Sequence, residues 1–408
     1  MLKNLSVLKF GGATLATPEL MKGVAQRINE IKNQGSDVVV VVSAPGDMTD
    51  ELIAKAKAIT PFPDEREMDM LLATGEQQSI ALMAIALKSL NCDAISFTGP
   101  QVGIITDDAH NKARIVKMGG DKIRKALHLG KVVIVAGFQG ETEDEEITTL
   151  GRGGSDLTAV ALAAALSATI CEFYKDVDGV FTADPRVVPN ASKLSQLTYD
   201  EMLEMASSGA QVLFNRSVEF AKKNKIVLHV RSSTKPDSGT LIMEEVRQME
   251  GVLVSGVTHT KDEAKITILW VPDKPGIAAK IFSRLADEDL NIDVIVQDIS
   301  EEGSTNISFT IPEKDLPKAK RVVEALVAEI GAKGFQADDR IGKVSVVGVG
   351  MRSHSGVAAA MFQALYEKGI NILMISTSEI KISCIVNEDR VEEAVRAIHE
   401  RFKLSNLT

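Results

Sequence analysis

The sequence has few aromatic residues and no surplus of positive charge. Only 4% of its 408 residues are Phe, Trp or Tyr, with a single Trp, so it lacks the rows of aromatic side chains on which single-stranded nucleic acids stack. The formal net charge is −10, whereas proteins that bind the phosphate backbone normally carry a positive surplus. We therefore expect no nucleic-acid partner, and any anionic substrate must be held by a few local cations.

Cysteines and long apolar runs are also scarce. Cys92, Cys171 and Cys384 are odd in number and widely spaced, which indicates buried reduced thiols. The N-terminal residues contain Lys3 and Lys9 but no apolar core of a signal peptide, and no later run looks long enough to span a bilayer. We therefore expect a cytoplasmic protein without a membrane partner. The content of 45% hydrophobic and 25% charged residues is typical of a globular protein, here with two or three domains.

The N-terminal half reads as strands alternating with helices. Residues 5–10 predict a short strand, Thr17 and Pro18 suit the start of a helix, and Gly35 suits its end. Residues 38–42 are five valines, a run typical of a strand buried on both faces. Similar runs return at residues 132–136 and 169–174. This pattern predicts an α/β fold with a mostly parallel sheet between helix layers.

An internal repeat occupies the C-terminal part, after a polar stretch at residues 243–251. Residues 275–282 align with residues 355–362 at an offset of 80, and the alignment continues through Leu285 and Leu365. Each copy reads strand, glycine turn, helix, strand, strand, helix, which is a ferredoxin-like βαββαβ pattern. Two copies are too few for a solenoid, so we expect a side-by-side pair.

Two glycine-containing segments could bind anions. In residues 9–12, Lys-Phe-Gly-Gly, a lysine ends a strand and two glycines allow backbone N–H groups to approach a phosphate, although an ordinary tight turn explains the segment equally well. Residues 151–156, Gly-Arg-Gly-Gly-Ser-Asp, precede an Ala- and Leu-rich helix whose N-terminus favours anions. Arg152 there can hold a carboxylate with two parallel hydrogen bonds. A plain helix cap would explain Ser155 or Asp156 but not the whole cluster.

Other polar residues follow predicted strands or begin helices. Residues 174–186 start where a buried strand should end, so their carboxylates could serve a metal or ribose and their arginine a phosphate, unless the segment is an acidic surface turn. Glu76 is predicted to start a long apolar helix, where a carboxylate is favourable whatever its function. Ser43 follows the valine strand and could be a simple helix cap.

Taken together, these segments resemble one family, the aspartate kinases. Its motifs occur here in the family's order: Lys9-Phe10-Gly11-Gly12, Val42-Ser43-Ala44, Thr74-Gly75-Glu76, Gly137-Phe138-Gln139-Gly140, residues 151–156 and residues 176–186. The resemblance implies an amino-acid-kinase domain at residues 1–245 and paired ACT domains at 263–340 and 341–408. Residues 246–262 would be a linker and a strand contributed to the pair. The implied reaction converts ATP and L-aspartate into ADP and 4-phospho-L-aspartate, with Mg²⁺.

The resemblance also implies a role for each motif residue. Lys9 would neutralise the transferring phosphoryl group, and Asp156 would organise this lysine and the metal. The aspartate site would contain Thr49, Glu76 for the ammonium, Phe138, Arg152 for the carboxylate, Gly153, Gly154 and Ser155. The nucleotide site would contain Lys9, Gly11, Gly12, Ser43, Asp176, Phe181, Asp184 and Arg186.

The sequence departs from the family pattern at a few positions, and other functions stay open. Ala13 stands where Ser or Thr is usual, with Thr14 next; Gln211 stands where many relatives carry Lys; and Ser355 stands where the first repeat has Pro. Another kinase of this fold, acting on glutamate, acetylglutamate, carbamate or UMP, is one alternative. A non-catalytic amino-acid-binding regulator is another, which the retained Lys9, Arg152 and Asp156 disfavour.

The repeat predicts an effector site. In each copy a glycine turn opens a helix whose N–H groups could hold an amino acid's carboxylate. The residues expected in the first copy are Asp273, Lys274, Pro275, Gly276, Ile277 and Ala278, with Asp273, Gln297 and Asn306 accepting from the ammonium. Lysine, threonine or both could be the effector, bound in an oligomer that is at least a dimer through the ACT domains. The alternative is a pure oligomerisation module, and an internal start at Met249 could also yield a separate regulatory subunit.

Overall fold

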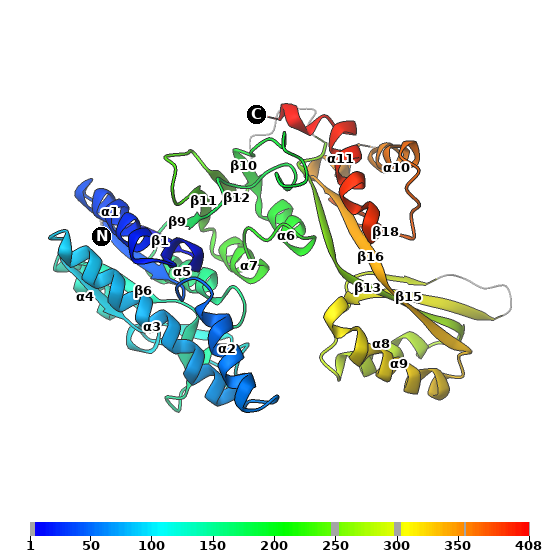
Figure 1. Cartoon of the computed structure of the whole chain (residues 1–408), viewed down its shortest axis with the longest axis horizontal. Helices are drawn as coiled ribbons and strands as arrows, with labels where there is room; N and C mark the ends of the chain where they lie inside the picture. Colours follow the sequence, from blue (N-terminus) through cyan, green and yellow to red (C-terminus); the bar gives the residue numbers. More distant parts are fainter. Residues whose placement is uncertain (1–4, 246–252, 298–302, 355, 408) are drawn as a thin grey trace.

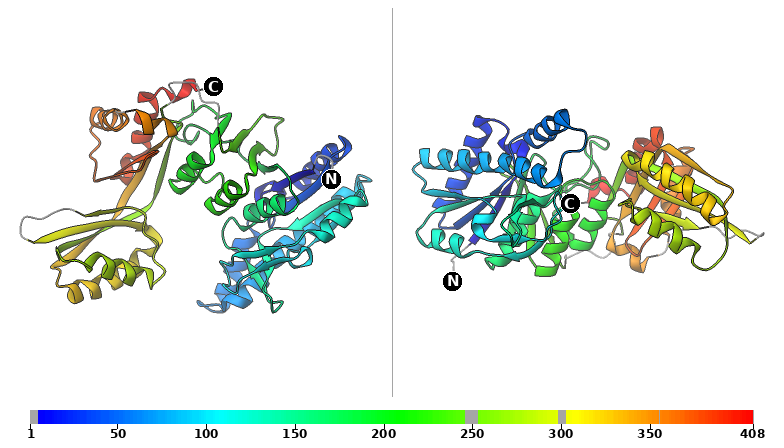
Figure 2. Two further views of the ribbon diagram at one scale, coloured as in Figure 1. Left: turned by 180° about the vertical axis from the view of Figure 1, so that it is seen from behind. Right: turned by 90° about the horizontal axis from the view of Figure 1, so that it is seen from below.

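A computed structural model describes residues 5–245, 253–297, 303–354 and 356–407 (Figure 1). Residues 246–252, which include Met249 and begin the predicted 246–262 segment, lie outside the described residues, as does Ser355. The chain forms an α/β part followed by a sheet with two pairs of helices, and the two parts lie side by side (Figures 1 and 2).

The core of the first part is an eight-stranded sheet in the order β10-β12-β11-β9-β1-β2-β6-β3. The strands are β1 (Leu5–Phe10), β2 (Asp37–Val42), β3 (Ala94–Phe97), β6 (Val132–Ala136), β9 (Ile170–Lys175), β10 (Gln196–Thr198), β11 (Val227–Ser232) and β12 (Thr240–Met243). All neighbours are parallel except β11 and β12. The predicted mostly parallel sheet is therefore confirmed.

Helices cover both faces of this sheet, as the valine strand requires. Val39 and Val41 pack into the core on one face, and Val38, Val40 and Val42 into the core on the other. One face carries α1 (Pro18–Asn33) and α3 (Glu65–Ser89); the other carries α4 (Asp121–His128), α5 (Gly154–Ala165), α6 (Tyr199–Ser207) and α7 (Asn215–Asn224). A run of β-branched residues suits this position because both sides of the strand are dry.

The first helix begins and ends where the sequence predicts. Thr17 caps α1 by accepting a hydrogen bond from the backbone N–H of Leu20, and Pro18 is its first residue. Gly35 follows its end with φ 90°, a left-handed conformation that glycine adopts without strain. The segment from η1 (Gly12–Leu15) leads into this helix, and α2 (Met48–Ile59) follows β2.

Helix α3 corrects one expectation from the sequence. With 25 residues and a mean hydropathy of 1.3 in its most apolar window, it is long and apolar enough to cross a membrane. Half of that window is buried inside the fold, where Ile80, Met83 and Leu87 pack against the central sheet. Its apolar character therefore comes from its place in the core.

A small four-stranded sheet, which the sequence did not predict, lies beside α3 in the order β5-β4-β7-β8. Its strands are β4 (Ile104–Thr106), β5 (Ile115–Met118), β7 (Gln139–Glu141) and β8 (Ile147–Thr149), and η2 (Pro100–Val102) precedes β4. These strands are only three or four residues long, too short for a periodic pattern to identify them.

The C-terminal part is one antiparallel sheet of six strands, in the order β14-β15-β13-β16-β18-β17. The strands are β13 (Gly256–Pro272), β14 (Ile295–Gln297), β15 (Ser304–Pro312), β16 (Gly334–Val347), β17 (Met374–Thr377) and β18 (Lys381–Asn387). Its helices are α8 (Ile277–Ala286), α9 (Leu316–Ile330), α10 (Val357–Glu367) and α11 (Val391–Arg401). Short turns of 3₁₀ helix are η3 (Glu313–Asp315), η4 (Val349–Ser353), η5 (Glu388–Arg390) and η6 (Leu404–Asn406).

The two long strands are shared between the two copies of the repeat. The first copy runs β13-α8-β14-β15-α9-β16, a complete βαββαβ unit. In the second copy no strand follows α11 among the described residues, and the start of β13 pairs there with the end of β16, Gly256 opposite Val347. Register shifts between Thr260 and Lys265 mark the place where β13 passes from one copy to the other. The pair is thus interlocked by two strands that run through both units (Figure 1).

Candidate active site

A cluster of three charged side chains, of which Lys9 and Asp156 are buried and Lys175 is partly buried, lies at the carboxyl ends of β1 and β9. Nζ of Lys9, at the end of β1, lies 2.6 Å from Oδ1 of Asp156, in the first turn of α5. Nζ of Lys175, the last residue of β9, lies 2.9 Å from Oδ2 of the same carboxylate. Lys9 and Asp156 are 5% and 1% exposed. Parallel pairing of β1 with β9 places the two lysines on neighbouring strands.

The two lysines keep the central carboxylate ionised. Burial alone would raise the pKa of Asp156, but the charges of Lys175 and Lys9 and their hydrogen bonds outweigh burial and lower it. Burial, together with the charge of Lys175, lowers the pKa of Lys9, and the pair with Asp156 offsets this shift only in part. The cluster is an anion between two cations, so it has cationic character to offer to a further anion.

Glycines shape the start of α5. Gly151 and Gly153 have φ of 74° and 76°, and Gly153 is the N-cap residue, without any side-chain cap. A Cβ on Gly153 would lie 2.3 Å from the ring of Phe214, so this position also needs glycine for space. Ser155 and Asp156 lie inside the helix, so the plain capping role considered for them is not what the structure has.

Glu76 is not at a helix N-terminus, contrary to the expectation from the sequence. It lies in the middle of α3, which begins earlier because Asp64 caps it by accepting from the N–H groups of Arg66 and Glu67. Glu76 is 3% exposed; its Oε1 accepts a hydrogen bond of 3.0 Å from the N–H of Ala44, and its Oε2 has no partner among the described residues. Burial raises the pKa of Glu76 to about 7.

A cavity of about 780 Å³ brings together the residues expected at the aspartate site. Its lining includes Lys9, Ser43, Thr49, Glu76, Phe138, Arg152, Gly153, Gly154, Ser155 and Asp156. Gly151, from the predicted anion-binding segment, lines it too. Sequence reasoning missed further lining residues: Asp50, Ile53, Pro61, Phe62, Pro63, Glu65, Met68, Leu72, Asn111, Thr149 and Phe214. Most of these carry no motif, and only the fold brings them to the cavity.

A second cavity, of about 730 Å³, contains four more of the residues expected to bind the nucleotide. Asp176, Phe181, Asp184 and Arg186 line it, as does Gln211. The Arg186 side chain is 89% exposed and forms an ion pair of 2.7 Å with Asp184. Residues 257–262 of β13 also line this cavity, so the six-stranded sheet contributes to its wall.

Lys175 joins the two cavities and was missed by sequence reasoning. It lines the second cavity, while its ion-pair partner Asp156 lines the first. The available signal was its position at the end of a buried strand, the same position that identified Lys9.

The glycine pair of the first motif has a packing role in this structure. A Cβ on Gly12 would lie 2.6 Å from the backbone oxygen of Ala44, so no larger residue fits. A Cβ on Gly11 would lie 3.7 Å from Nζ of Lys9, which places its backbone beside the charged cluster. The hydroxyl of Thr14, next to the departure at Ala13, donates to the carbonyl of Gly11. Neither glycine is among the residues that line the two cavities.

The residues expected at the effector site lie together at one end of the six-stranded sheet, in neither cavity. Asp273 follows β13, whose last residue pairs with the first residue of β15, and Gly276 caps α8 with φ 92°. Asp273, Lys274, Pro275, Gly276, Ala278 and Gln297 are exposed, and Ile277 and Asn306 are half-buried. Oδ1 of Asn306 already accepts a hydrogen bond from the N–H of Trp270. A single chain therefore offers these residues on an open surface.

Comparison with known proteins agrees with this arrangement. Residues 4–232 match the amino acid kinase family, and residues 271–326 and 344–402 match the ACT domain. The chain is 51% identical over 406 residues to the aspartokinase of Corynebacterium glutamicum, covering 98% of this chain and 96% of the relative. It is 50% identical over 401 residues to the aspartate kinase of Pseudomonas putida, covering 98% of each. The chain belongs to the aspartokinases.

Solved structures support the fold of this aspartate kinase. Escherichia coli aspartokinase III in complex with aspartate and ADP, in its R-state, superposes with a TM-score of 0.82 at 23% identity, over 98% of this chain and 99% of that one. The same enzyme with lysine and aspartate, in its T-state, gives 0.76 at 24% identity, over 98% and 99%. The relatives at 50% and 51% identity make the chain an aspartate kinase with regulatory ACT domains, and the alternatives of another kinase of this fold or a non-catalytic regulator are set aside.

Proposed function

We propose that this aspartate kinase transfers the γ-phosphoryl group of ATP to the side-chain carboxylate of L-aspartate at the Lys9–Asp156–Lys175 cluster, giving 4-phospho-L-aspartate. One observation carries the proposal: Asp156 lines one cavity, Lys175 lines the other, and the two form an ion pair of 2.9 Å. A phosphoryl group that moves from a nucleotide in the second cavity to an amino acid in the first passes this junction.

L-aspartate fits the polar groups of the first cavity. The Oε2 atom of Glu76, buried and without a partner among the described residues, is a natural acceptor for the substrate ammonium. The guanidinium of Arg152 is suited to the α-carboxylate, which it can bind with two parallel hydrogen bonds. Thr49 and Phe138 line the same cavity and complete its polar and apolar walls.

Charge stabilisation and alignment account for the catalysis. The attacking carboxylate is already a nucleophile and needs no general base, so the barrier comes from repulsion between two anions. Lys9 and Lys175 supply two ammonium groups fixed by one carboxylate, and they need no reorganisation when the phosphoryl group moves. The N–H groups at the start of α5 form the positive end of the helix dipole, next to Asp156 in the first turn, and this end also favours a bound anion.

The nucleotide is assigned to the second cavity. Asp176, Phe181, Asp184 and Arg186 line it. Ser43 lines the first cavity together with Lys9, and Gly11, which precedes Gly12, lies beside Nζ of Lys9, where the terminal phosphate would arrive. The exposed Arg186 must leave or share its pair with Asp184 to bind phosphate. Gln211 lines this cavity without a charge, so a cationic contact at that position is absent in this chain.

Mg²⁺ is expected to accompany ATP. No cluster of three or more His, Cys, Asp or Glu side chains occurs in the described part of the chain, which fits an ion that is held by one or two carboxylates together with phosphates. Asp156 and Asp176, one in each cavity, are the residues that would hold it. When bound, the ion neutralises charge on the phosphate oxygens.

Hydroxylamine trapping tests the proposed reaction. The enzyme is incubated with ATP, Mg²⁺, hydroxylamine and L-aspartate, and the hydroxamate is measured, since an acyl phosphate yields it. Parallel reactions contain L-glutamate, N-acetylglutamate or UMP. Hydroxamate from L-aspartate alone supports the proposal, and its absence with L-aspartate refutes it.

We further propose feedback regulation through the ACT pair, with lysine, threonine or both as effectors bound near Asp273, Gln297 and Asn306. Strand β13 gives a physical route: it ends next to Asp273, and its residues 257–262 line the nucleotide cavity. Binding at one end of a strand can alter its other end only if the strand moves as a unit between two arrangements. We therefore expect effectors to change ATP affinity or turnover.

The remaining assignments follow from the family. We propose a cytoplasmic homo-oligomer, at least a dimer through the ACT domains, since the effector residues are on an open surface in one chain. We divide the chain into a kinase domain at residues 1–245, a connecting segment at 246–262 and ACT domains at 263–340 and 341–408.

A further inference from the structure

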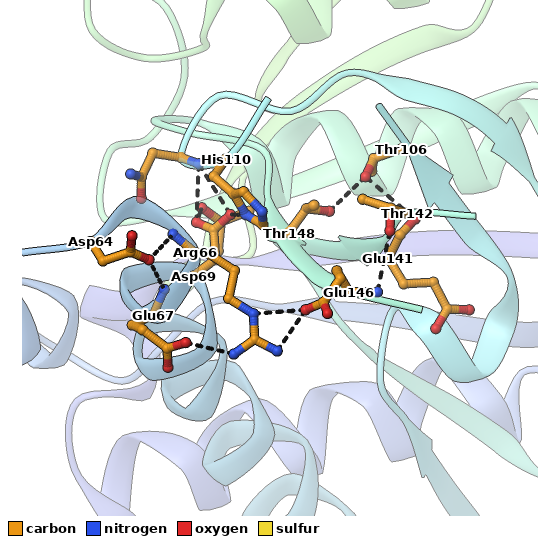
Figure 3. A network of polar contacts seen from close by, with 12 residues as sticks. Asp64, Arg66, Glu67, Asp69, Thr106, His110, Glu141, Thr142, Glu146 and Thr148 are labelled. Carbon is orange, nitrogen blue, oxygen red and sulfur yellow. Dashed lines mark hydrogen bonds and ion pairs between the residues drawn. The ribbon is translucent and has the colours of Figure 1, made fainter. Parts of the chain in front are cut away.

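Asp69 is a fully buried carboxylate that the roles assigned so far do not use. It lies on α3, seven residues before Glu76 and so on the same face of the helix. It accepts hydrogen bonds from the N–H of Asn111, 3.1 Å from each oxygen, and from the hydroxyl of Thr149. Nδ1 of His110 lies 2.8 Å from its Oδ2 (Figure 3).

These hydrogen bonds hold Asn111 in an unusual backbone conformation. Asn111 has φ 62°, in the left-handed region that asparagine tolerates better than most residues. It belongs to the connection between β4 and β5, and Asp69 is the acceptor of its N–H group. The carboxylate thus fixes the conformation of this turn from the adjacent helix.

The turn contacts the aspartate site directly. The backbone oxygen of Asn111 lies 2.9 Å from the position that a Cβ on Gly151 would take, next to Arg152. Asn111 and Thr149 both line the first cavity. The Asn111 carboxamide makes no hydrogen bond to any residue that the structure describes, so its donors are free for a ligand.

Neighbouring contacts show that a buried carboxylate is not needed merely to join elements in this region. Beside Asp69, Thr106 and Thr148 link β4 to β8 through neutral hydroxyls 2.6 Å apart, and the carboxylate of Glu146, which pairs with Arg66, lies at the surface (Figure 3). Burying a carboxylate is costly unless several donors surround it. Asp69 gathers donors from the two residues, Asn111 and Thr149, that line the cavity.

We infer that Asn111 is a further contact for the substrate, donating a carboxamide N–H to the α-carboxylate of L-aspartate beside Arg152, and that Asp69 is the positioning residue that holds it there. The inference rests on the proposed aspartate site. A neutral amide adds a directed hydrogen bond for the carboxylate without adding charge near Lys9.

Asn111→Gly tests the contact, because glycine keeps the left-handed backbone and removes only the carboxamide. We expect the KM for L-aspartate to rise about tenfold or more, with kcat within about threefold and the KM for ATP within about twofold of wild type. Asn91→Gly is the matched control: Asn91 is also left-handed, with φ 56°, but lies outside the cavity. Its kinetic constants should match those of wild type.

Asp69→Asn tests the positioning role. It should raise the KM for L-aspartate by a similar factor, about tenfold, while the KM for ATP stays within about twofold. In the double variant with Asn111→Gly, the KM should lie within about twofold of Asn111→Gly alone, because both changes remove the same contact. Asp64→Asn, which weakens only the cap of α3, should not change the KM for L-aspartate.

The possible outcomes separate this inference from the proposed function. If wild type forms hydroxamate from L-aspartate but Asn111→Gly has a wild-type KM for it, the substrate contact is wrong. If the double variant has a KM for L-aspartate well above that of Asn111→Gly alone, Asp69 acts by another route and the positioning claim is wrong. If wild type forms no hydroxamate from L-aspartate, the proposed function itself fails. Should Asp69→Asn not fold, Asn111→Gly still decides the contact.

Discussion

Nζ of Lys9 and Oδ1 of Asp156 lie 2.6 Å apart, and both residues are almost fully buried. The residues are far apart in the chain, one at the end of β1 and one in the first turn of α5. Removing one partner of a buried pair usually leaves an uncompensated charge. Here Lys175 also pairs with Asp156, so either lysine can be removed while the carboxylate keeps a partner.

Lys9→Met should therefore abolish most turnover while the protein stays folded. The loss of one fixed ammonium group from the transition state is expected to lower kcat by about 10²–10³-fold. The measurement is hydroxamate formation at saturating substrates, with thermal unfolding followed in parallel. Lys32→Met is the control, because Lys32 forms a partly exposed pair with Asp37 far from the cavities. A folded Lys9→Met enzyme with near-normal kcat would contradict the role of this lysine.

Lys175→Met should affect both nucleotide binding and turnover, because Lys175 lies at the junction of the two cavities. We expect a rise in the KM for ATP together with a fall in kcat of about 10²-fold, and a smaller change in the KM for L-aspartate. Lys235→Met is the control: this exposed lysine pairs with Asp178 on the surface. If only the KM for L-aspartate changes, Lys175 belongs to the aspartate site alone and its assignment to the junction of the two cavities is wrong.

Arg152→Lys should weaken the binding of L-aspartate far more than the binding of ATP. Lysine keeps the charge but loses the planar fork that matches a carboxylate, and an increase of about 10- to 100-fold in the KM for L-aspartate is expected. Initial rates measured while each substrate is varied in turn give the two KM values. If the KM for ATP rises instead, Arg152 belongs to the nucleotide site.

Glu76 should make aspartate binding depend on pH. Burial raises its pKa from 4.5 to about 7, so the protonated form is favoured in the unliganded protein below about pH 7. This preference adds to the free energy of unfolding below pH 4.5, and the contribution, about 3 kcal/mol, is lost as pH rises through about 7. Binding the substrate ammonium needs the carboxylate, so the KM for L-aspartate should rise as pH falls below about 7.

The matched variant for this prediction is Glu76→Gln, which has the same shape and no charge. Its KM for L-aspartate should be high at every pH and should not change between about pH 6 and 8. A KM profile in Glu76→Gln that matches the wild-type profile would show that another group titrates.

Regulation is tested by combining Asp273→Ala with Gln297→Ala. Both side chains are exposed and lie outside the two cavities, so kcat without effector should stay close to wild type. Inhibition by lysine, threonine or their mixture should be lost, which dose-response curves for wild type and variant would measure. If wild type responds to neither amino acid, alone or jointly, the effector site is wrong although the kinase assignment stands.

Several elements could be read directly from the chain, because their signals are local. The valines of β2 require burial on both faces, and Thr17 with Pro18 marks the start of α1. The motif residues 151–156 were expected at a helix N-terminus, and α5 begins at Gly154. In each case the pattern reflects hydrogen bonding or burial within a few residues.

Glu76 shows where local reasoning fell short. Its position in the middle of α3 follows from the cap at Asp64, and Glu67 three residues later forms a start signal that was overlooked. Its burial could not be foreseen, because the donor to its carboxylate is the N–H of Ala44, in the loop after β2. The small sheet β5-β4-β7-β8 was also missed, since three-residue strands are stabilised by their neighbours.

By itself, the sequence determined the alternation of strands and helices, the repeat and the residue types at each strand end, because these depend on neighbours in the chain. Tertiary structure alone decided that Lys175 joins Lys9 on Asp156, that Asn111 enters the cavity, and that β13 serves both copies of the repeat. Each of these requires segments far apart in sequence to pack together. Their contacts depend on strand order and register, which long-range burial selects and no local pattern specifies.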